Sequence, residues 1–176
     1  CLFYLRDCRG GQGERRFFRV CFKWLCSYDP AAARRNLIHL SEYGRWDDLI
    51  YSTYETPLFY EALKIIKHQL ALDVECKTPS LLAKWLPSEN ASSRKTKEVA
   101  NKIRRYLGMT HKQYRLTLSV LRSRINVLEK LMSEGRWDEI EFDKIPSRAG
   151  MIYRNAFARH DIERAKSEKA VQTYAD

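Results

Sequence analysis

Two helix-length stripes of apolar residues, placed one after the other, constrain the fold of this chain more than any other feature. The first stripe follows a serine pair at 92–93 and consists of Val99, Ile103, Tyr106 and Leu107. The second consists of Tyr114, Leu118, Leu121, Ile125, Leu128 and Met132. Such spacing places the apolar side chains of each stripe on one side of an α-helix. The chain is therefore predicted to contain two consecutive amphipathic helices.

The junction between these helices carries a stop signal and a start signal. Gly108 is suited to end the first helix, because glycine tolerates the left-handed backbone conformation that follows helix ends. Thr110 and Gln113 have the spacing of a capping box, in which each side chain satisfies a free backbone N–H at a helix start. The second helix is therefore predicted to begin directly after Thr110.

The middle of the chain shows the same helical spacing and no strand pattern. One helix is predicted from Pro30 to Tyr43, with Leu37, Ile38 and Leu40 facing inward. Another is predicted from about Pro57 to Val74, with a stripe of Leu58, Ala62, Ile65, Ile66 and Leu70. No segment alternates between apolar and polar residues with a period of two. We therefore expect an all-α fold with essentially no sheet.

The N-terminal part contains a glycine-rich segment and a strongly apolar helix. Residues 1–8 have the pattern of a helix end, and Gly10 to Gly13 follow. A glycine-rich turn before a helix can bind phosphate, but the Gly-Lys-Ser/Thr of a P-loop is missing and no strand precedes it. A turn between helices is the expected role. The segment 17–25 is apolar on nearly all sides, so it is predicted to be buried between neighbouring helices.

One short motif occurs twice. Gly44-Arg45-Trp46-Asp47-Asp48-Leu49 recurs as Gly135-Arg136-Trp137-Asp138-Glu139-Ile140. The glycine is expected to close one helix and the aspartate to cap the next; the alternative makes both tryptophans platforms for stacking bases. Repeated helix junctions favour a HEAT-like helical repeat, an α-solenoid, that spans residues 1–176 as a single domain. Since the sequence opens on Cys1 within a helical pattern, we expect it to be a fragment of a longer chain.

Positive charge is concentrated between Lys84 and Arg124. This block holds 11 Lys or Arg against 2 Glu, which is +9 of the chain's formal net charge of +10. An ordinary surface interleaves acids and bases, so the block predicts a polyanionic partner; the alternative is a solvated helix surface. The predicted nucleic-acid contacts are Lys84, Arg94, Lys95, Lys97, Lys102, Arg104, Arg105, Lys112, Arg115 and Arg122. Candidates for stacking on unpaired bases are Tyr106, Tyr114 and Trp85, for which the alternative is a place in the core.

Cysteine and histidine spacing predicts neither a metal site nor a cofactor. Cys21 and Cys26 form one C-x₄-C pair, and Cys8 and His39 do not supply the second pair of a structural zinc site. The odd count of 5 cysteines indicates reduced thiols, so we expect an intracellular, cytoplasmic protein. The 4 histidines lie in no catalytic motif, which predicts a protein that is not an enzyme. No apolar run approaches the ~20 residues that cross a bilayer, so no membrane partner is expected.

Several stretches resemble known helical modules. RDCRGGQGERRFFRVCFKWL and the later YGRWDDL are similar to the Ro-type helical-repeat module called TROVE (telomerase, Ro and vault). AKWLPSENASSRKTKEVANKIRRYLGMTHKQYR and IPSRAGMIYRNAFARHD resemble more closely a relative of uncharacterised function that couples such helices to a C-terminal von Willebrand A domain. No Asp-x-Ser-x-Ser metal-adhesion motif is present, so that domain is absent from this segment. The resemblance covers about Leu5 to Asp161 and implies HEAT-like helices, RNA binding on a basic surface and no catalytic residues.

Two function classes follow from these observations. The first is a non-catalytic RNA-binding module that holds structured or single-stranded RNA on the basic block from Lys84 to Arg124, with recognition of shape and unpaired bases rather than a sequence code. The alternative is a protein-interaction scaffold that binds an acidic partner, or a ribonucleoprotein or capsid neighbour.

Overall fold

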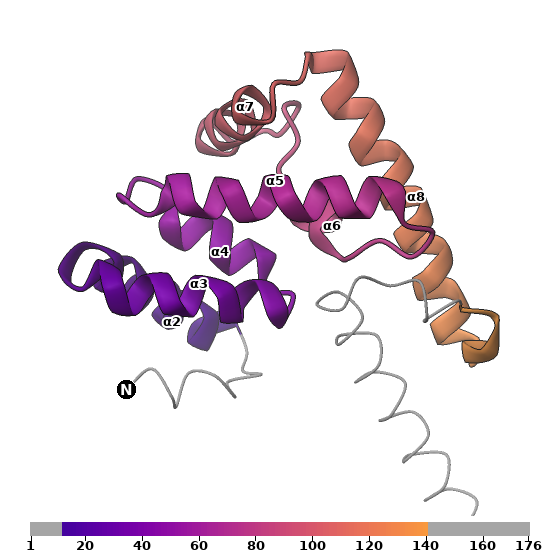
Figure 1. The fold of residues 1–176 in the computed structure, drawn as a ribbon, viewed down its shortest axis with the longest axis horizontal. Coiled ribbons are helices and arrows are strands. Elements are labelled where there is room, and N and C mark those ends of the chain that lie inside the picture. Colours follow the sequence, from indigo (N-terminus) through magenta and orange to yellow (C-terminus); the bar gives the residue numbers. More distant parts are fainter. Residues whose placement is uncertain (1–11, 141–176) are drawn as a thin grey trace, which may run out of the picture.

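The computed structural model describes residues 12–140, which form an array of helices (Figure 1). The elements are α2 (Gln12–Tyr28), α3 (Pro30–Glu42), α4 (Trp46–Thr53), α5 (Phe59–Glu75), α6 (Leu82–Trp85), α7 (Arg94–Leu107), α8 (His111–Ser133) and the short 3₁₀ helix η1 (Trp137–Glu139). Residues 12–140 contain no strand, which confirms the all-α class. The predictions for the helix end at residues 1–8 and for Gly10 and Gly11 lie outside the described residues.

The junction between α7 and α8 is built as its sequence predicts. Ser93 caps α7 by accepting a hydrogen bond from the Thr96 N–H at 3.5 Å. Gly108 ends α7 in the left-handed conformation with φ of 69°. The capping box begins α8: the Thr110 N–H donates to Gln113 Oε1 at 2.8 Å, and the Gln113 N–H donates to Thr110 Oγ1 at 3.2 Å. These are local interactions, and local sequence specifies them.

The long helix α5 runs through the middle of the fold. In Figure 1, α2, α3 and α4 lie on one side of α5, α7 is seen nearly end-on on the other side, and α8 descends past the far end of α5. One apolar core joins all of these helices. Its largest fully buried side chains are Trp46, Tyr114, Phe22, Leu37, Leu49, Ile50, Leu58, Ile66, Leu82, Leu86 and Ile103. The stripe predicted for α7 and the first four residues of that for α8 face this core. Leu128 and Met132 of α8 pack in a second, smaller cluster with Trp137 and Ile140.

The helix α2 differs from its prediction of burial on all sides. Phe18, Phe22 and Cys26 are buried against α3 and α4. The opposite face is exposed in the described part of the chain and carries Phe17, Val20, Trp24 and Tyr28. Because α2 packs on its neighbours along one side, its apolar residues divide into a buried and an exposed stripe. Ile38 of α3, predicted to face inward, is likewise 44% exposed.

The two copies of the Gly-Arg-Trp-Asp motif form matching helix corners. Gly44 and Gly135 have φ of 66° and 70°. In each copy the following arginine N–H closes the same turn, from Arg45 to Leu40 O and from Arg136 to Leu131 O, both at 2.9 Å. Both tryptophans are buried, Trp46 at 2% and Trp137 at 9% exposure. Burial at this level leaves no ring face for a base, so both serve as core residues.

The predicted aspartate caps at these corners are wrong. The N-cap residues are Arg45 and Arg136, and neither makes a side-chain capping bond. The aspartate of the first copy, Asp47, instead pairs with Arg19 Nη2 at 2.7 Å. The acids one position later pair with the arginines of the motif: Asp48 accepts from Arg45 Nη2 at 2.7 Å, and Glu139 pairs with Arg136. An acid in the first helical turn can also interact with the helix dipole without being the cap. The HEAT-like solenoid stays a prediction.

Candidate nucleic-acid interface

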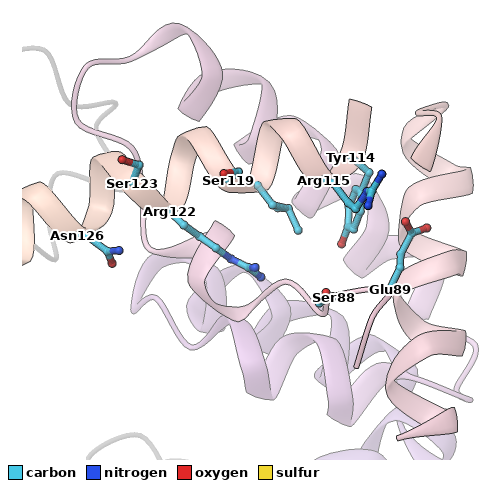
Figure 2. A pocket seen from close by; sticks show the side chains of 9 residues that line it. Ser88, Glu89, Tyr114, Arg115, Ser119, Arg122, Ser123 and Asn126 are labelled. Atoms are coloured by element: carbon cyan, nitrogen blue, oxygen red, sulfur yellow. The ribbon is translucent and has the colours of Figure 1, made fainter. Parts of the chain in front are cut away.

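A polar pocket of about 390 Å³ lies between α8 and the segment that precedes α7 (Figure 2). A stripe at helical spacing on α8 supplies one wall, and residues just after α6 supply the other. The lining residues are Ser88, Glu89, Tyr114, Arg115, Leu118, Ser119, Arg122, Ser123 and Asn126. The pocket therefore offers hydroxyl, amide and guanidinium donors from one helix face beside the apolar stripe.

Arg122 connects the two walls of this pocket through hydrogen bonds. Its Nε donates to the carbonyl of Ala83 at 2.9 Å and its Nη2 to the carbonyl of Leu86 at 2.7 Å. Figure 2 shows the side chain extending from α8 toward the segment that carries Ser88. These carbonyls lie at the end of α6, where backbone acceptors lack helical partners. Arg122 thus has a structural role as well as a charge at the pocket.

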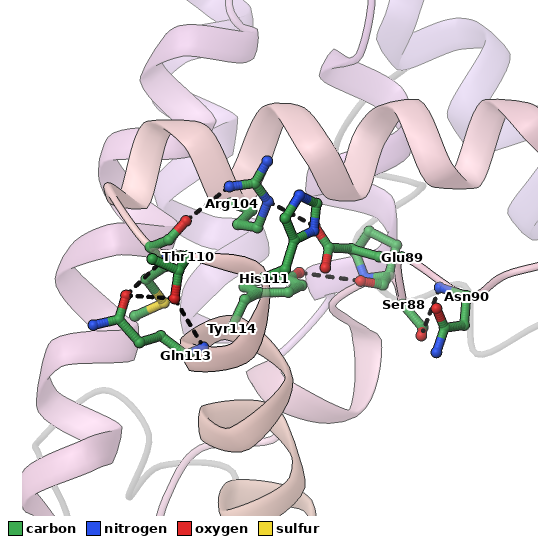
Figure 3. Close-up of polar contacts among 10 residues, drawn as sticks. Ser88, Glu89, Asn90, Arg104, Thr110, His111, Gln113 and Tyr114 are labelled. Atoms are coloured by element: carbon green, nitrogen blue, oxygen red, sulfur yellow. Dashed lines mark hydrogen bonds and ion pairs between the residues drawn. The ribbon is translucent and has the colours of Figure 1, made fainter.

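Glu89 is the acidic centre of the corner between α7 and α8 (Figure 3). Its Oε1 accepts from Arg104 Nε at 2.6 Å and lies 2.8 Å from His111 Nδ1. Arg104 also donates through Nη1 to the carbonyl of Met109 at 2.8 Å, and its side chain is only 13% exposed. Arg104 therefore holds the turn at 108–110 in place and presents little charge to solvent.

Three more of the predicted contacts have acidic partners on the surface. Lys84 pairs with Glu129 at 2.6 Å, Arg94 with Glu98 at 3.1 Å, and Lys95 with Glu55 at 3.6 Å. Lys23 also pairs with Glu55, and this hydrogen bond is the largest cause that lowers the pKa of Glu55. Exposed pairs of this kind are weak, so these lysines and the arginine can exchange partners at small cost.

The remaining predicted cations are exposed and are not neutralised. Among the described residues, no carboxylate lies within ion-pair distance of the exposed side chains of Lys97, Lys102, Arg105, Lys112 and Arg115. Lys102 lies over the Tyr54 ring, with Nζ 4.7 Å from the ring centroid. We call Lys97, Arg105, Lys112 and Arg115 the basic patch. Lys97 and Arg105 lie on α7, Lys112 and Arg115 lie in the first turns of α8, and Arg115 also lines the pocket.

The three aromatic candidates have different environments. Tyr114 is buried, and its hydroxyl donates to the carbonyl of Pro87 at 3.1 Å (Figure 3). Burial raises the pKa of Tyr114, and no ring face is available for a base. Trp85 is half-buried against the core. Tyr106 is half-buried as well and packs edge-on with Tyr60, with 5.1 Å between ring centroids.

The described residues contain no group of three or more His, Cys, Asp or Glu side chains placed to hold a metal ion. Cys21, Cys26 and Cys76 are free thiols, and burial raises the pKa of the Cys26 thiol to about 11. Cys8 lies outside the described residues. Within the same range no helix has the length and apolar character to cross a membrane.

Five polar residues of the pocket were not predicted from the sequence: Ser88, Glu89, Ser119, Ser123 and Asn126. A local signal existed for one wall, because Arg115, Ser119, Arg122 and Asn126 recur at spacings of 4, 3 and 4 beside the apolar stripe of α8. No local signal existed for Glu89, whose bond to Arg104 joins residues 15 positions apart.

The fold and the site define an all-helical domain with an unneutralised basic patch beside a polar pocket. By sequence, the chain belongs to the family described as “Domain of unknown function (DUF2828)”, whose match covers residues 73–167 and so includes α6, α7 and α8. The chain is also 32% identical over 183 residues to “Uncharacterized protein L728” of Acanthamoeba polyphaga mimivirus. That alignment covers 90% of this chain and 32% of the viral protein, so the chain spans about a third of that relative's length. No solved structure matches the chain.

Proposed function

We propose that this protein is a non-catalytic RNA-binding module that uses the corner between α7 and α8. The observation that carries the proposal is the basic patch: Lys97, Arg105, Lys112 and Arg115 are exposed and have no carboxylate partner among the described residues. Unneutralised cations on neighbouring helices attract a polyanion, and phosphate contacts release the counterions condensed on it.

The polar pocket adds hydrogen-bond donors next to one residue of the basic patch. Arg115 belongs to both, and the seryl and asparagine side chains beside it can donate hydrogen bonds to a phosphodiester or to a base edge. Arg122 is already held by two carbonyls, so its guanidinium loses little freedom on binding. We assign positioning roles to Arg104 and Arg122, and phosphate contacts to the basic patch.

The kind of RNA and the HEAT-like continuation of the helices are proposed from sequence resemblance. The likeness to the Ro-type TROVE module suggests structured or irregular RNA as the ligand and a HEAT-like continuation of the helices. The family match spans the segment that carries the patch and the pocket, residues 84–126. Single-stranded or irregular RNA is the expected ligand, since proteins read unpaired bases more readily than a closed A-form helix.

A binding series with a matched charge control tests the proposal. Single-stranded RNA, duplex RNA and duplex DNA are titrated with the 176-residue chain at two salt concentrations. The double variant Lys112→Glu, Arg115→Glu should bind single-stranded RNA about tenfold or more weakly, and its salt slope should fall by about 1.4, since each lost phosphate contact on a single strand removes ~0.7. Arg34→Glu, Arg35→Glu changes the net charge equally on the exposed face of α3 and should bind nearly as the parent.

Equal losses in both double variants would mean that only overall charge matters, which contradicts a localised site. Binding that does not weaken with salt in the parent chain would contradict phosphate recognition altogether.

One observation favours a second function, a protein-interaction scaffold. The exposed stripe of α2 places Phe17, Val20, Trp24 and Tyr28 at helical spacing, with Trp24 and Tyr28 stacked at 4.3 Å. Exposed apolar stripes often mark protein contacts. Purified protein that carries no nucleic-acid absorbance and shows no salt-sensitive RNA shift would favour this function, with an acidic or ribonucleoprotein partner.

A further inference from the structure

An exposed tyrosine of α5 packs against a half-buried tyrosine of α7. Tyr60 of α5 and Tyr106 of α7 meet edge to face, with 5.1 Å between ring centroids and 88° between ring planes. Tyr60 is 57% exposed, so part of its side chain is available to a ligand. Partial burial and then a hydrogen bond with Tyr60 raise the pKa of Tyr106. The two rings therefore contact each other where α5 meets α7.

Two lysines of α5 lie over the rings of this pair. Lys64 Nζ lies 5.1 Å from the centroid of the Tyr60 ring, and Lys67 Nζ lies 5.9 Å from that of the Tyr106 ring. Both lysines are exposed. Tyr60, Lys64 and Lys67 follow one face of α5, and Tyr106 adjoins Arg105 of the basic patch along α7. Two exposed cations therefore lie beside the aromatic pair, where they are available to phosphates.

We propose that Tyr60, set against Tyr106 and flanked by Lys64 and Lys67, is a stacking platform for one unpaired RNA base. This inference rests on the proposed function and specifies why single strands are preferred. A base in a duplex has both faces covered by its neighbours, whereas an unpaired base can stack on a protein ring.

The same lysines are placed to serve the neighbouring phosphates. Lys64 lies over Tyr60 at the long end of the cation–π range and also pairs with Glu61 at 3.5 Å on the surface. Both contacts are weak because they are exposed. An incoming base takes the place of the ammonium over the ring, and the released lysine side chain reaches the phosphate on either side of that base. Lys67, over the Tyr106 ring, can reach a phosphate of the same strand.

Substitution of Tyr60, combined with a change in the RNA, tests the inference. The probe is a single-stranded RNA of about 12 nucleotides that carries 2-aminopurine at one position, prepared also with that base removed. Tyr60→Leu keeps an apolar contact for Tyr106 but has no ring, and Tyr60→Phe keeps the ring without the hydroxyl. Tyr28→Leu removes an exposed tyrosine from α2 and serves as the control.

A stacking platform predicts a specific pattern of losses. Tyr60→Leu should weaken binding of the intact single strand about 5- to 100-fold, abolish the quenching of 2-aminopurine fluorescence and leave duplex RNA binding unchanged. Tyr60→Phe and Tyr28→Leu should behave as the parent chain. On the RNA that lacks the base, Tyr60→Leu should cause little further loss, because the two changes remove one interaction.

Three results would overturn the inference, and they can be told apart. Parent-like affinity and quenching in Tyr60→Leu would remove the platform but leave the proposed function intact. An equal loss toward single-stranded and duplex RNA would show that Tyr60 supports the backbone contacts instead. No salt-sensitive RNA binding by the parent chain would overturn the proposed function and the platform together.

Discussion

Arg115 and Arg122 lie seven residues apart on the pocket side of α8, and only one of them is bound to the rest of the protein. Arg122 donates to the carbonyls of Ala83 and Leu86, whereas Arg115 is exposed without a carboxylate partner among the described residues. Truncating Arg122 leaves two backbone acceptors without their donor, so Arg122→Ala should lower the free energy of unfolding by about 1.5–3 kcal/mol. Arg115→Ala should change it by less than about 0.5 kcal/mol.

Urea titration followed by circular dichroism measures both values. If the two alanine variants lost stability equally, the bonds from Arg122 would have no net effect on folding. The same pair separates stability from binding, because Arg115→Ala should weaken RNA binding in a protein that is as stable as the parent.

At the scale of single elements, Asp73 joins the end of α5 to the start of α6. Its carboxylate is buried and accepts from the Ser80 N–H at 2.9 Å, from the Ser80 hydroxyl at 2.6 Å and from Gln69 Nε2 at 2.9 Å. Burial raises the pKa of Asp73 above its ordinary value of 3.8, and the hydrogen bonds offset this effect only in part.

A raised pKa in the folded state fixes the sign of the pH dependence. The folded protein binds this proton more tightly than the unfolded chain, so the stabilisation is full below pH 3.8 and is lost as pH rises through the folded pKa. Asp73→Asn is neutral at every pH. The parent should therefore gain stability relative to Asp73→Asn when the pH falls from about 7 to about 3, measured as the difference between two urea titrations. A constant difference would mean that Asp73 has the same pKa in both states.

The elements that sequence predicts well are those with local signals. The ends of α7 and α8 follow from Ser93, Gly108 and the Thr110–Gln113 box, whose bonds join residues a few positions apart. The orientation of α2 could not be predicted in this way, because its apolar residues cover nearly all sides and only the position of α3 and α4 decides which are buried.

The contacts within the candidate site could likewise not be predicted from local sequence patterns. Charge density marked the block from Lys84 to Arg124 as a candidate region, but it could not separate Arg104 from Arg105. Arg104 has partners at Glu89 and Met109, and Arg105 faces solvent. The contacts of Arg122 join residues 36 and 39 positions apart, and no periodic pattern in the sequence encodes such pairings.

Within the charge distribution of the whole molecule, one cation, Lys112, occupies a position that is unfavourable for folding stability. The first turn of α8 contains no acid, although Lys112 lies there and the amino end of a helix favours negative charge. Lys112 also lies near other exposed cations in a chain with a net charge of +10. The start of α8 thus holds a cation where folding alone would favour an acid, which agrees with the proposed role of Lys112 in binding a polyanion.

Replacing Lys112 by glutamate should therefore stabilise the fold and weaken the proposed RNA binding. Lys112→Glu should raise the free energy of unfolding by about 0.3–1 kcal/mol at about 20 mM salt, because a carboxylate interacts favourably with the helix dipole. The gain should shrink at about 200 mM salt, where screening weakens exposed charges. Thermal unfolding at both salt concentrations measures the effect.

Lys130→Glu supplies the control at the other end of the same helix. Lys130 lies in the last turn of α8, where a cation is favourable, and pairs with Glu134 at 3.8 Å, so its reversal should destabilise the protein. If Lys112→Glu were less stable than the parent, Lys112 would have a structural role in the fold. The position of Lys112 at the start of α8 would then have a structural explanation and would no longer support a polyanionic partner.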